Sequence, residues 1–159
     1  MDDPVARVRR ALLACGHADT IIAFPAGTRT AADAAAAIGC SVAQIAKSIV
    51  FRAGEQAVVV VASGASRVDK RRAGEAVALK LAAAGPEFVL SATGFAAGGV
   101  APIGLPGASK LVFDRDLLAL HPIWAAAGSP QHVFETDAVM LLRMTGAVVA
   151  DIRQEVGRL

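Results

Sequence analysis

The sequence predicts a single domain of mixed α/β class. Its 159 residues are close to the roughly 150 that one domain contains. Helical and strand patterns alternate along the chain, with both a hairpin and longer crossovers, which is typical of one sheet packed with helices. Apolar residues make up 55% of the chain and charged residues 19%, a balance that favours a buried core and excludes intrinsic disorder.

The N-terminal part of the chain is predicted to form two helices around a short strand. Apolar residues recur at helical spacing from Val5 to Leu13, and Gly16 is a typical helix end. Thr20 to Phe24 is predicted to be a strand that Pro25 ends. Thr30 then begins an alanine-rich helix that ends before Gly39.

A capped turn and a hairpin are predicted next. Ser41-Val42-Ala43-Gln44 fits the capping box S-x-x-Q, so a short helix is expected from there to about Lys47. The β-branched runs that follow, Ser48–Phe51 and Val58–Val61, predict two strands joined at Gly54-Glu55. Because the second run is continuously apolar, we expect this strand to be buried on both faces.

The second half of the chain is predicted to contain a long glycine-rich loop between regular elements. Asp69 and Pro86 begin helices, and the second of these ends at Gly94. The segment Gly94–Gly107 holds five glycines and two prolines among its 14 residues, and structureless loops of this length are commonly functional. The other predicted elements are strands at Leu111–Phe113, Ile123–Trp124, His132–Phe134 and Ala147–Ile152, and helices capped by Asp114 and Thr136.

Composition narrows the class of protein. The net charge of +2 neither requires nor excludes a polyanionic partner. Only 4% of the residues are aromatic, so few are available to stack on the bases of a single-stranded nucleic acid. Cys15 and Cys40 form neither a disulfide framework nor a CxxC pair, as expected in a reducing cytosol. The acidic start Met1–Pro4 is unlike a signal peptide, and the apolar run Ala57–Ala62 is too short to span a bilayer. We therefore expect a cytoplasmic protein that has no membrane contact.

Motifs of the common catalytic machineries are missing from the sequence. It contains no HExxH, no G-x-S-x-G and no Walker A pattern, and its three histidines have no metal-ligand spacing. Helix capping accounts for the carboxylates Asp114 and Asp116. We expect neither a metal nor a cofactor, and no Ser–His–Asp triad can be assembled from the sequence.

Three features remain as candidates for chemistry. Lys47 is flanked by predicted core, so it is either a cation held over a pocket or a lysine whose stem lies along apolar surface. The loop Gly98–Gly104 either offers main-chain N–H groups to an anion or is a plain turn. Gly128–His132 is a tight turn with a hydroxyl and an imidazole, although turn hydroxyls usually bond their own backbone.

Taken together and in order, these segments resemble the YbaK/EbsC family. The resemblance rests on Arg29-Thr30-Ala31, Gln44–Phe51, Gly98–Gly104 and Gly128-Ser129-Pro130, and it extends from about Val5 to Ile152. The family contains stand-alone aminoacyl-tRNA deacylases related to the editing domain of bacterial prolyl-tRNA synthetases. It implies a curved, barrel-like mixed sheet surrounded by helices, with residues 1–159 forming one editing domain.

The resemblance also implies a reaction and its substrates. Family members hydrolyse the ester that joins a wrong small amino acid (alanine, 2-aminobutyrate, serine, threonine or cysteine) to a tRNA, commonly proline tRNA. Prolyl-tRNA synthetase is then an expected partner. The uncharged turn Ser129–Gln131 and Val133 depart from the cysteine-specific branch, where the turn is basic and an aspartate follows.

The roles of individual residues follow from the same resemblance. Lys47 would hold the terminal adenosine or its phosphate, and main-chain amides of the loop would stabilise the oxyanion, so no side-chain nucleophile is needed. The expected catalytic set is Lys47, Gly98, Gly99, Val100, Ala101 and Pro102, and the expected substrate-binding set is Gly104, Gly128, Ser129 and His132.

A tRNA substrate requires phosphate contacts. Arg67, Lys70, Arg71 and Arg72 form the dense basic cluster of the sequence, which is either a phosphate-binding surface or a solvated helix face. Two other functions stay open: a binding or regulatory module without activity, and a hydrolase of small aminoacyl esters that does not require RNA.

Overall fold

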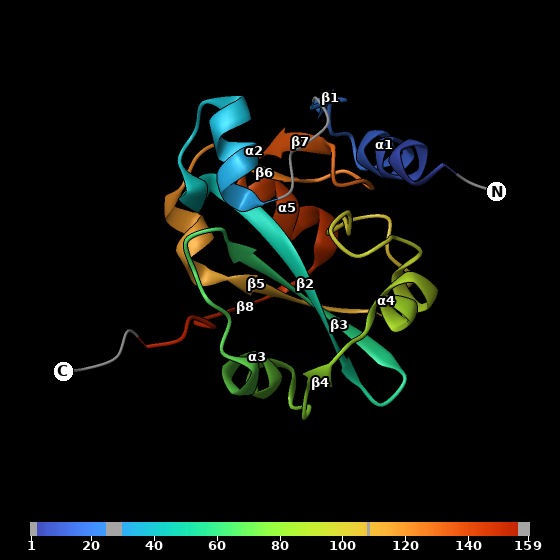
Figure 1. Ribbon diagram of the computed structural model, residues 1–159, viewed down its shortest axis with the longest axis vertical. Helices are drawn as coiled ribbons and strands as arrows, with labels where there is room; N and C mark the ends of the chain where they lie inside the picture. Colours follow the sequence, from blue (N-terminus) through green and yellow to red (C-terminus); the bar gives the residue numbers. More distant parts are fainter. Residues whose placement is uncertain (1–2, 25–29, 108, 156–159) are drawn as a thin grey trace.

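The structure is a computed structural model that describes residues 3–24, 30–107 and 109–155 (Figure 1). Capping explains where most of the helices begin, since Asp3, Thr30, Asp69 and Asp137 each accept a hydrogen bond from a main-chain N–H of the first turn. The helices are α1 (Pro4–Ala14), α2 (Ala31–Ile38), α3 (Lys70–Val77), α4 (Pro86–Thr93) and α5 (Ala138–Thr145), with 3₁₀-helices η1 (Val42–Gln44) and η2 (Arg115–Ala119).

One mixed sheet contains the strands of the described residues. Its order is β1-β7-β6-β2-β3-β5-β8, with β4 paired to β2, so the sheet is open and does not close into a barrel. The pairs β2–β6, β3–β5 and β5–β8 are parallel, and the others are antiparallel. The strands are β1 (Ile21–Ala23), β2 (Ile45–Ala53), β3 (Gln56–Ser63), β4 (Ala82–Ala83), β5 (Lys110–Asp114), β6 (Ile123–Ala126), β7 (His132–Thr136) and β8 (Val148–Ala150).

The mixed α/β class and the central hairpin are confirmed, and β3 is buried on both faces as predicted. Two local predictions are wrong. The helical turn after Ser41 ends at Gln44, and Lys47 lies inside β2, because pairing with β3 and β6 draws this segment into the sheet. Asp137, not Thr136, caps α5, since the Thr136 hydroxyl is buried against His17. Pro25 and Arg29 lie outside the described residues.

Successive residues of the β2–β3 hairpin face two different cores. Val59 and Val61 point to the core that contains α1, α4 and α5, whereas Val58, Val60 and Ala62 point to the core beneath α3. Figure 1 shows α2 near one end of the long axis of the molecule and α3 near the other. The hairpin therefore connects the two ends and separates the two cores.

The outer edge of β2 is interrupted. On this edge β6 pairs with Ile45 and Ala46, and β4 pairs with Phe51 and Arg52. Between these two pairings, within the described part of the chain, no strand covers residues 47–50. The gap leaves room for a cavity at the strand edge.

None of the described helices combines the length and the hydropathy that a membrane-spanning segment requires.

Candidate active site

A cavity of about 300 Å³ opens at the uncovered edge of β2. Residues of α2, of the β6–β7 hairpin and of the glycine-rich loop surround it. Most of its wall is apolar and includes Phe24, Ile45 and Trp124, which share one hydrophobic cluster, together with Val100 and Pro130. A concave, mostly apolar lining with a few polar groups is typical of a site for a small ligand.

Lys47 enters the cavity from the sheet. Its side chain is half-buried and lies opposite Ala62, so it projects from the face of the hairpin that carries α3. Among the described residues, the ammonium has no hydrogen-bond or ion-pair partner. A lysine without an internal partner at a cavity wall is a cation available to a phosphate or carboxyl oxygen.

The glycine-rich loop supplies main-chain donors. Gly98, at φ +89°, and Val100 line the cavity. The N–H of Gly99 donates to the carbonyl of Ala96 at 3.0 Å, which closes a turn and removes this amide from the available donors. Within the described residues the N–H groups of Gly98 and Val100 have no main-chain acceptor, so these two can serve a ligand oxygen.

A second turn brings a hydroxyl and an imidazole to the same cavity. The Oγ of Ser129 lies 2.6 Å from Nδ1 of His132 and accepts the N–H of Gln131 at 3.0 Å. Both Ser129 and His132 are half-buried and line the cavity. The hydroxyl is thus held by its own turn, and it fixes the ring of His132.

Burial changes the chemistry of one group behind the cavity. Cys40 packs against the small core that joins α2 to Ile45, and burial raises the pKa of its thiol. A raised pKa keeps this sulfur protonated near neutral pH and therefore a poor nucleophile. No group of three or more His, Cys, Asp and Glu side chains that could hold a metal occurs in the described part of the chain.

Comparison with known proteins places this architecture in a family. The family model described as the aminoacyl-tRNA editing domain matches residues 25–144 of the chain. The protein is a member of the aminoacyl-tRNA editing domain family. This assignment agrees with the resemblance found in the sequence.

Solved structures and a curated relative support the assignment. A proposed trans-editing enzyme for prolyl-tRNA synthetase is 39% identical, with a TM-score of 0.90 over 98% of this chain and 99% of that one. The hypothetical protein APE2540 is 30% identical, with a TM-score of 0.85 over 93% and 99% of the two chains. The uncharacterized protein YwhH of Bacillus subtilis is 33% identical over 113 residues, which are 70% of this chain and 72% of YwhH.

The editing domain brings five of the predicted site residues together: Lys47, Gly98, Val100, Ser129 and His132 all line the cavity. The other predicted residues of the two loops lie behind it. Gly99 packs on the main chain of Ser129, and Gly128 packs on that of Pro4. Ala101 and Pro102 are buried in the loop, and Gly104 lies beside Arg7 of α1.

The predicted basic cluster is divided by ion pairs. Arg71 pairs with Glu75 at 2.6 Å, and Arg72 contacts Asp151 and Glu155. The side chains of Arg67 and Lys70 are exposed and have no such partner among the described residues.

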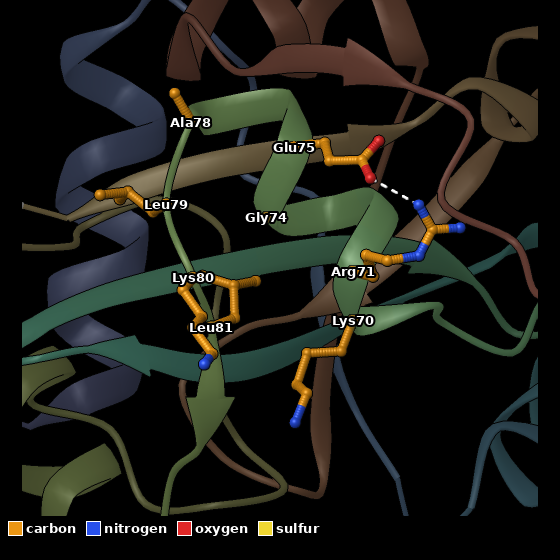
Figure 2. A pocket seen from close by; sticks show the side chains of 8 residues that line it. All are labelled: Lys70, Arg71, Gly74, Glu75, Ala78, Leu79, Lys80 and Leu81. Carbon is orange, nitrogen blue, oxygen red and sulfur yellow. Dashed lines mark hydrogen bonds and ion pairs between the residues drawn. The ribbon is translucent and has the colours of Figure 1, made fainter.

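Lys70 also borders a groove of about 450 Å³ between α3 and the segment 78–81 that leads to β4. Figure 2 shows the ammonium groups of Lys70 and Lys80 on the same side of this groove, and the Arg71–Glu75 ion pair on the opposite side. The groove is larger than the cavity at Lys47, but no residue of the glycine-rich loop lines it, whereas Lys47, Gly98 and Val100 all line the smaller cavity.

Sequence reasoning missed several groups of the site. Phe24 and Trp124 form apolar walls, and Ser48 adds a hydroxyl next to Lys47. Trp124 is the single tryptophan of the chain, but nothing in the sequence places it beside Lys47. Lys80 follows Arg72 by eight residues, outside the predicted basic cluster, and the fold brings it to the same groove as Lys70.

Proposed function

We propose that this protein hydrolyses the ester between a small, wrongly attached amino acid and the 3′-terminal adenosine of a tRNA. The observation that carries the proposal lies at one cavity of an editing domain. There a lysine without an ion-pair partner among the described residues meets two main-chain N–H groups without an acceptor among them. The relative described as a proposed trans-editing enzyme for prolyl-tRNA synthetase makes proline tRNA the first substrate to test.

The chemistry needs no side-chain nucleophile. A water oxygen bonds to the ester carbonyl carbon, and the carbonyl oxygen takes up the negative charge. The N–H groups of Gly98 and Val100 would stabilise that charge, as main-chain donors do in oxyanion holes. The bond to the ribose oxygen then breaks, and this oxygen gains a proton while the attacking water loses one. The products are a free amino acid and a tRNA with its terminal diol restored.

Lys47 and the second turn position the substrate in this scheme. The Lys47 ammonium would hold the terminal adenosine or its phosphate, which fixes the ester against the loop donors. Ser129 and His132 would form the wall opposite, with the imidazole held by the Ser129 hydroxyl. Gly99, Ala101, Pro102, Gly104 and Gly128 would act by shaping the two loops.

The tRNA body would contact the cations that ion pairs leave free. Lys70 and Lys80 lie on one side of the groove beside α3 (Figure 2). Arg67 is exposed on the segment that leads to α3. The Lys47 side chain projects from the face of the β2–β3 hairpin that packs on the core beneath α3. A nucleic acid whose 3′ end enters the cavity would therefore extend toward these lysines.

The test is a panel of proline tRNAs charged with alanine, 2-aminobutyrate, serine, threonine or cysteine. We expect the protein to release at least one of these amino acids well above the rate in buffer alone. Binding of the charged tRNAs without release would make the protein a binding module. A rate that depends neither on the tRNA body nor on salt would instead indicate a hydrolase of small aminoacyl esters.

A further inference from the structure

The uncovered edge of β2 presents main-chain groups to the cavity at one residue. The carbonyl of Ile45 accepts the N–H of Gly64 at 2.6 Å, so odd-numbered residues of β2 direct their main-chain groups toward β3. Even-numbered residues direct theirs to the outer edge. Ala46 meets β6 there and Arg52 meets β4, whereas Ser48 lies in the gap and lines the cavity.

The Ser48 side chain is also without a partner. Its Oγ is buried and, with Nε of Arg7, is one of two buried side-chain polar atoms in the described residues that make no hydrogen bond. The other hydroxyls of the cavity already accept hydrogen bonds: Thr30 from the N–H of Asp33, and Ser129 from that of Gln131. A buried hydroxyl without a partner costs free energy unless a ligand supplies one.

The position of this hydroxyl assigns it to one end of the substrate. Ser48 lies opposite Val61, on the face of the hairpin whose core includes Val100 of the glycine-rich loop. Lys47 projects from the other face. The proposed function places the ester carbonyl at the loop and the adenosine at Lys47, so Ser48 is on the side of the amino acid.

We infer that Ser48 selects amino acids whose side chain carries a hydroxyl, serine or threonine, over apolar ones of the same size. The inference rests on the proposed function. In this arrangement the main-chain groups of Ser48 that point to the outer edge of β2 hydrogen-bond the amino acid, as they would a residue of an added strand. The Oγ of Ser48 forms a hydrogen bond with the substrate hydroxyl. An apolar substrate would leave Oγ unpaired, and such a site discriminates strongly against the analogue that lacks the hydroxyl.

Serine and 2-aminobutyrate provide the matched pair for the test, since they differ by a hydroxyl in place of a methyl group. We compare kcat/KM for the two charged tRNAs in the wild-type protein, in Ser48→Ala and in Ser91→Ala, an exposed serine of α4. We expect the wild type to prefer serine. Loss of the hydrogen bond in Ser48→Ala should reduce the serine-to-aminobutyrate ratio about tenfold, and Ser91→Ala should leave it unchanged.

Other outcomes separate this inference from the proposed function. A ratio that is unchanged in Ser48→Ala, or equal losses for both substrates, overturns the selective role of Ser48 while the hydrolysis stands. Failure of the wild type to hydrolyse any charged tRNA removes the proposed function.

A binding measurement then decides the role of Ser48 without turnover. Calorimetry with non-hydrolysable amide analogues of seryl-adenosine and 2-aminobutyryl-adenosine should show the same tenfold change in ratio, and equal affinities would contradict the inference. The thermal midpoint of Ser48→Ala should be unchanged or higher, because the substitution removes an unsatisfied buried group.

Discussion

Gly99 packs directly on the main chain of Ser129, so that a Cβ on Gly99 would lie 2.7 Å from the Cα of Ser129. This contact joins the loop that contains Gly98 and Val100 to the turn that holds His132. Because the atoms in the way belong to the main chain, a side chain at position 99 could be accommodated only by moving one of the two loops.

We expect Gly99→Ala to separate the donors from the opposite wall. A displacement of about 1 Å at a reacting centre can reduce turnover about 100-fold, and overpacking costs about 1–3 kcal/mol of stability. Deacylation rates and urea unfolding measure the two effects. Gly107→Ala is the matched control, since a Cβ there meets nothing within 4 Å. Full activity in Gly99→Ala would show that the two loops need not be in contact.

Ser129→Ala tests whether the hydroxyl orients His132 or attacks the substrate. The substitution removes the 2.6 Å contact to Nδ1 and frees the ring to turn. We expect partial loss of turnover, about tenfold, because only the orientation of the imidazole is lost. A burst of an acyl-enzyme in the wild type, absent in the variant, would indicate instead that Ser129 is a nucleophile.

The salt dependence of tRNA binding tests the groove lysines. Each phosphate contact adds about 0.7–0.9 to the slope of log affinity against log salt concentration, so Lys70→Gln with Lys80→Gln should lower that slope by about 1.4–1.8. Arg71→Gln should change it less, because Glu75 already neutralises this arginine. Filter binding with full-length tRNA provides the measurement, and an unaltered slope in the double variant would place the tRNA body elsewhere.

Asp19, in the segment between α1 and β1, predicts that the free energy of unfolding depends on pH. The Asp19 carboxylate accepts a hydrogen bond from the main-chain N–H of Ile21, and this bond lowers the pKa of the carboxyl. The nearby Arg9 guanidinium also lowers this pKa. A carboxyl with a lowered folded-state pKa stabilises the fold above its unfolded pKa, and this contribution is lost as the pH falls through the folded value.

Asp19→Asn should therefore destabilise the protein near neutral pH and have no effect in strong acid. Urea unfolding across a pH series, with the exposed Glu135→Gln as control, measures the difference. A constant difference between wild type and Asp19→Asn at every pH would refute the electrostatic origin.

Local signals predicted most elements of the fold because their causes lie within a few residues. The helix starts at Thr30 and Asp69 and the turn at Gly54 each appear in the structure where the sequence indicates them. The capping box at Ser41 predicts helix as far as Lys47, but Ile45–Lys47 is strand, because its pairing partners on β3 and β6 are distant in sequence.

The candidate site was predictable only in part, for the same reason. Lys47 and the glycine-rich loop stand out in the sequence, but their common cavity depends on the gap between β6 and β4. The neutralisation of Arg72 comes from Asp151 and Glu155, about 80 residues away. Arg7 of α1 stacks on Phe95 and donates to the carbonyl of Thr93, a support for the loop that no local pattern indicates.

The rate of deacylation by Lys47→Met tests the central claim most directly. A single-turnover assay on the charged tRNA that the wild type hydrolyses best should show a loss of at least about 100-fold, with the unfolding midpoint unchanged. Lys110→Met, at an exposed position of β5, should retain the wild-type rate. Wild-type turnover by Lys47→Met would contradict the account, because the cation that fixes the ester against Gly98 and Val100 would then be dispensable.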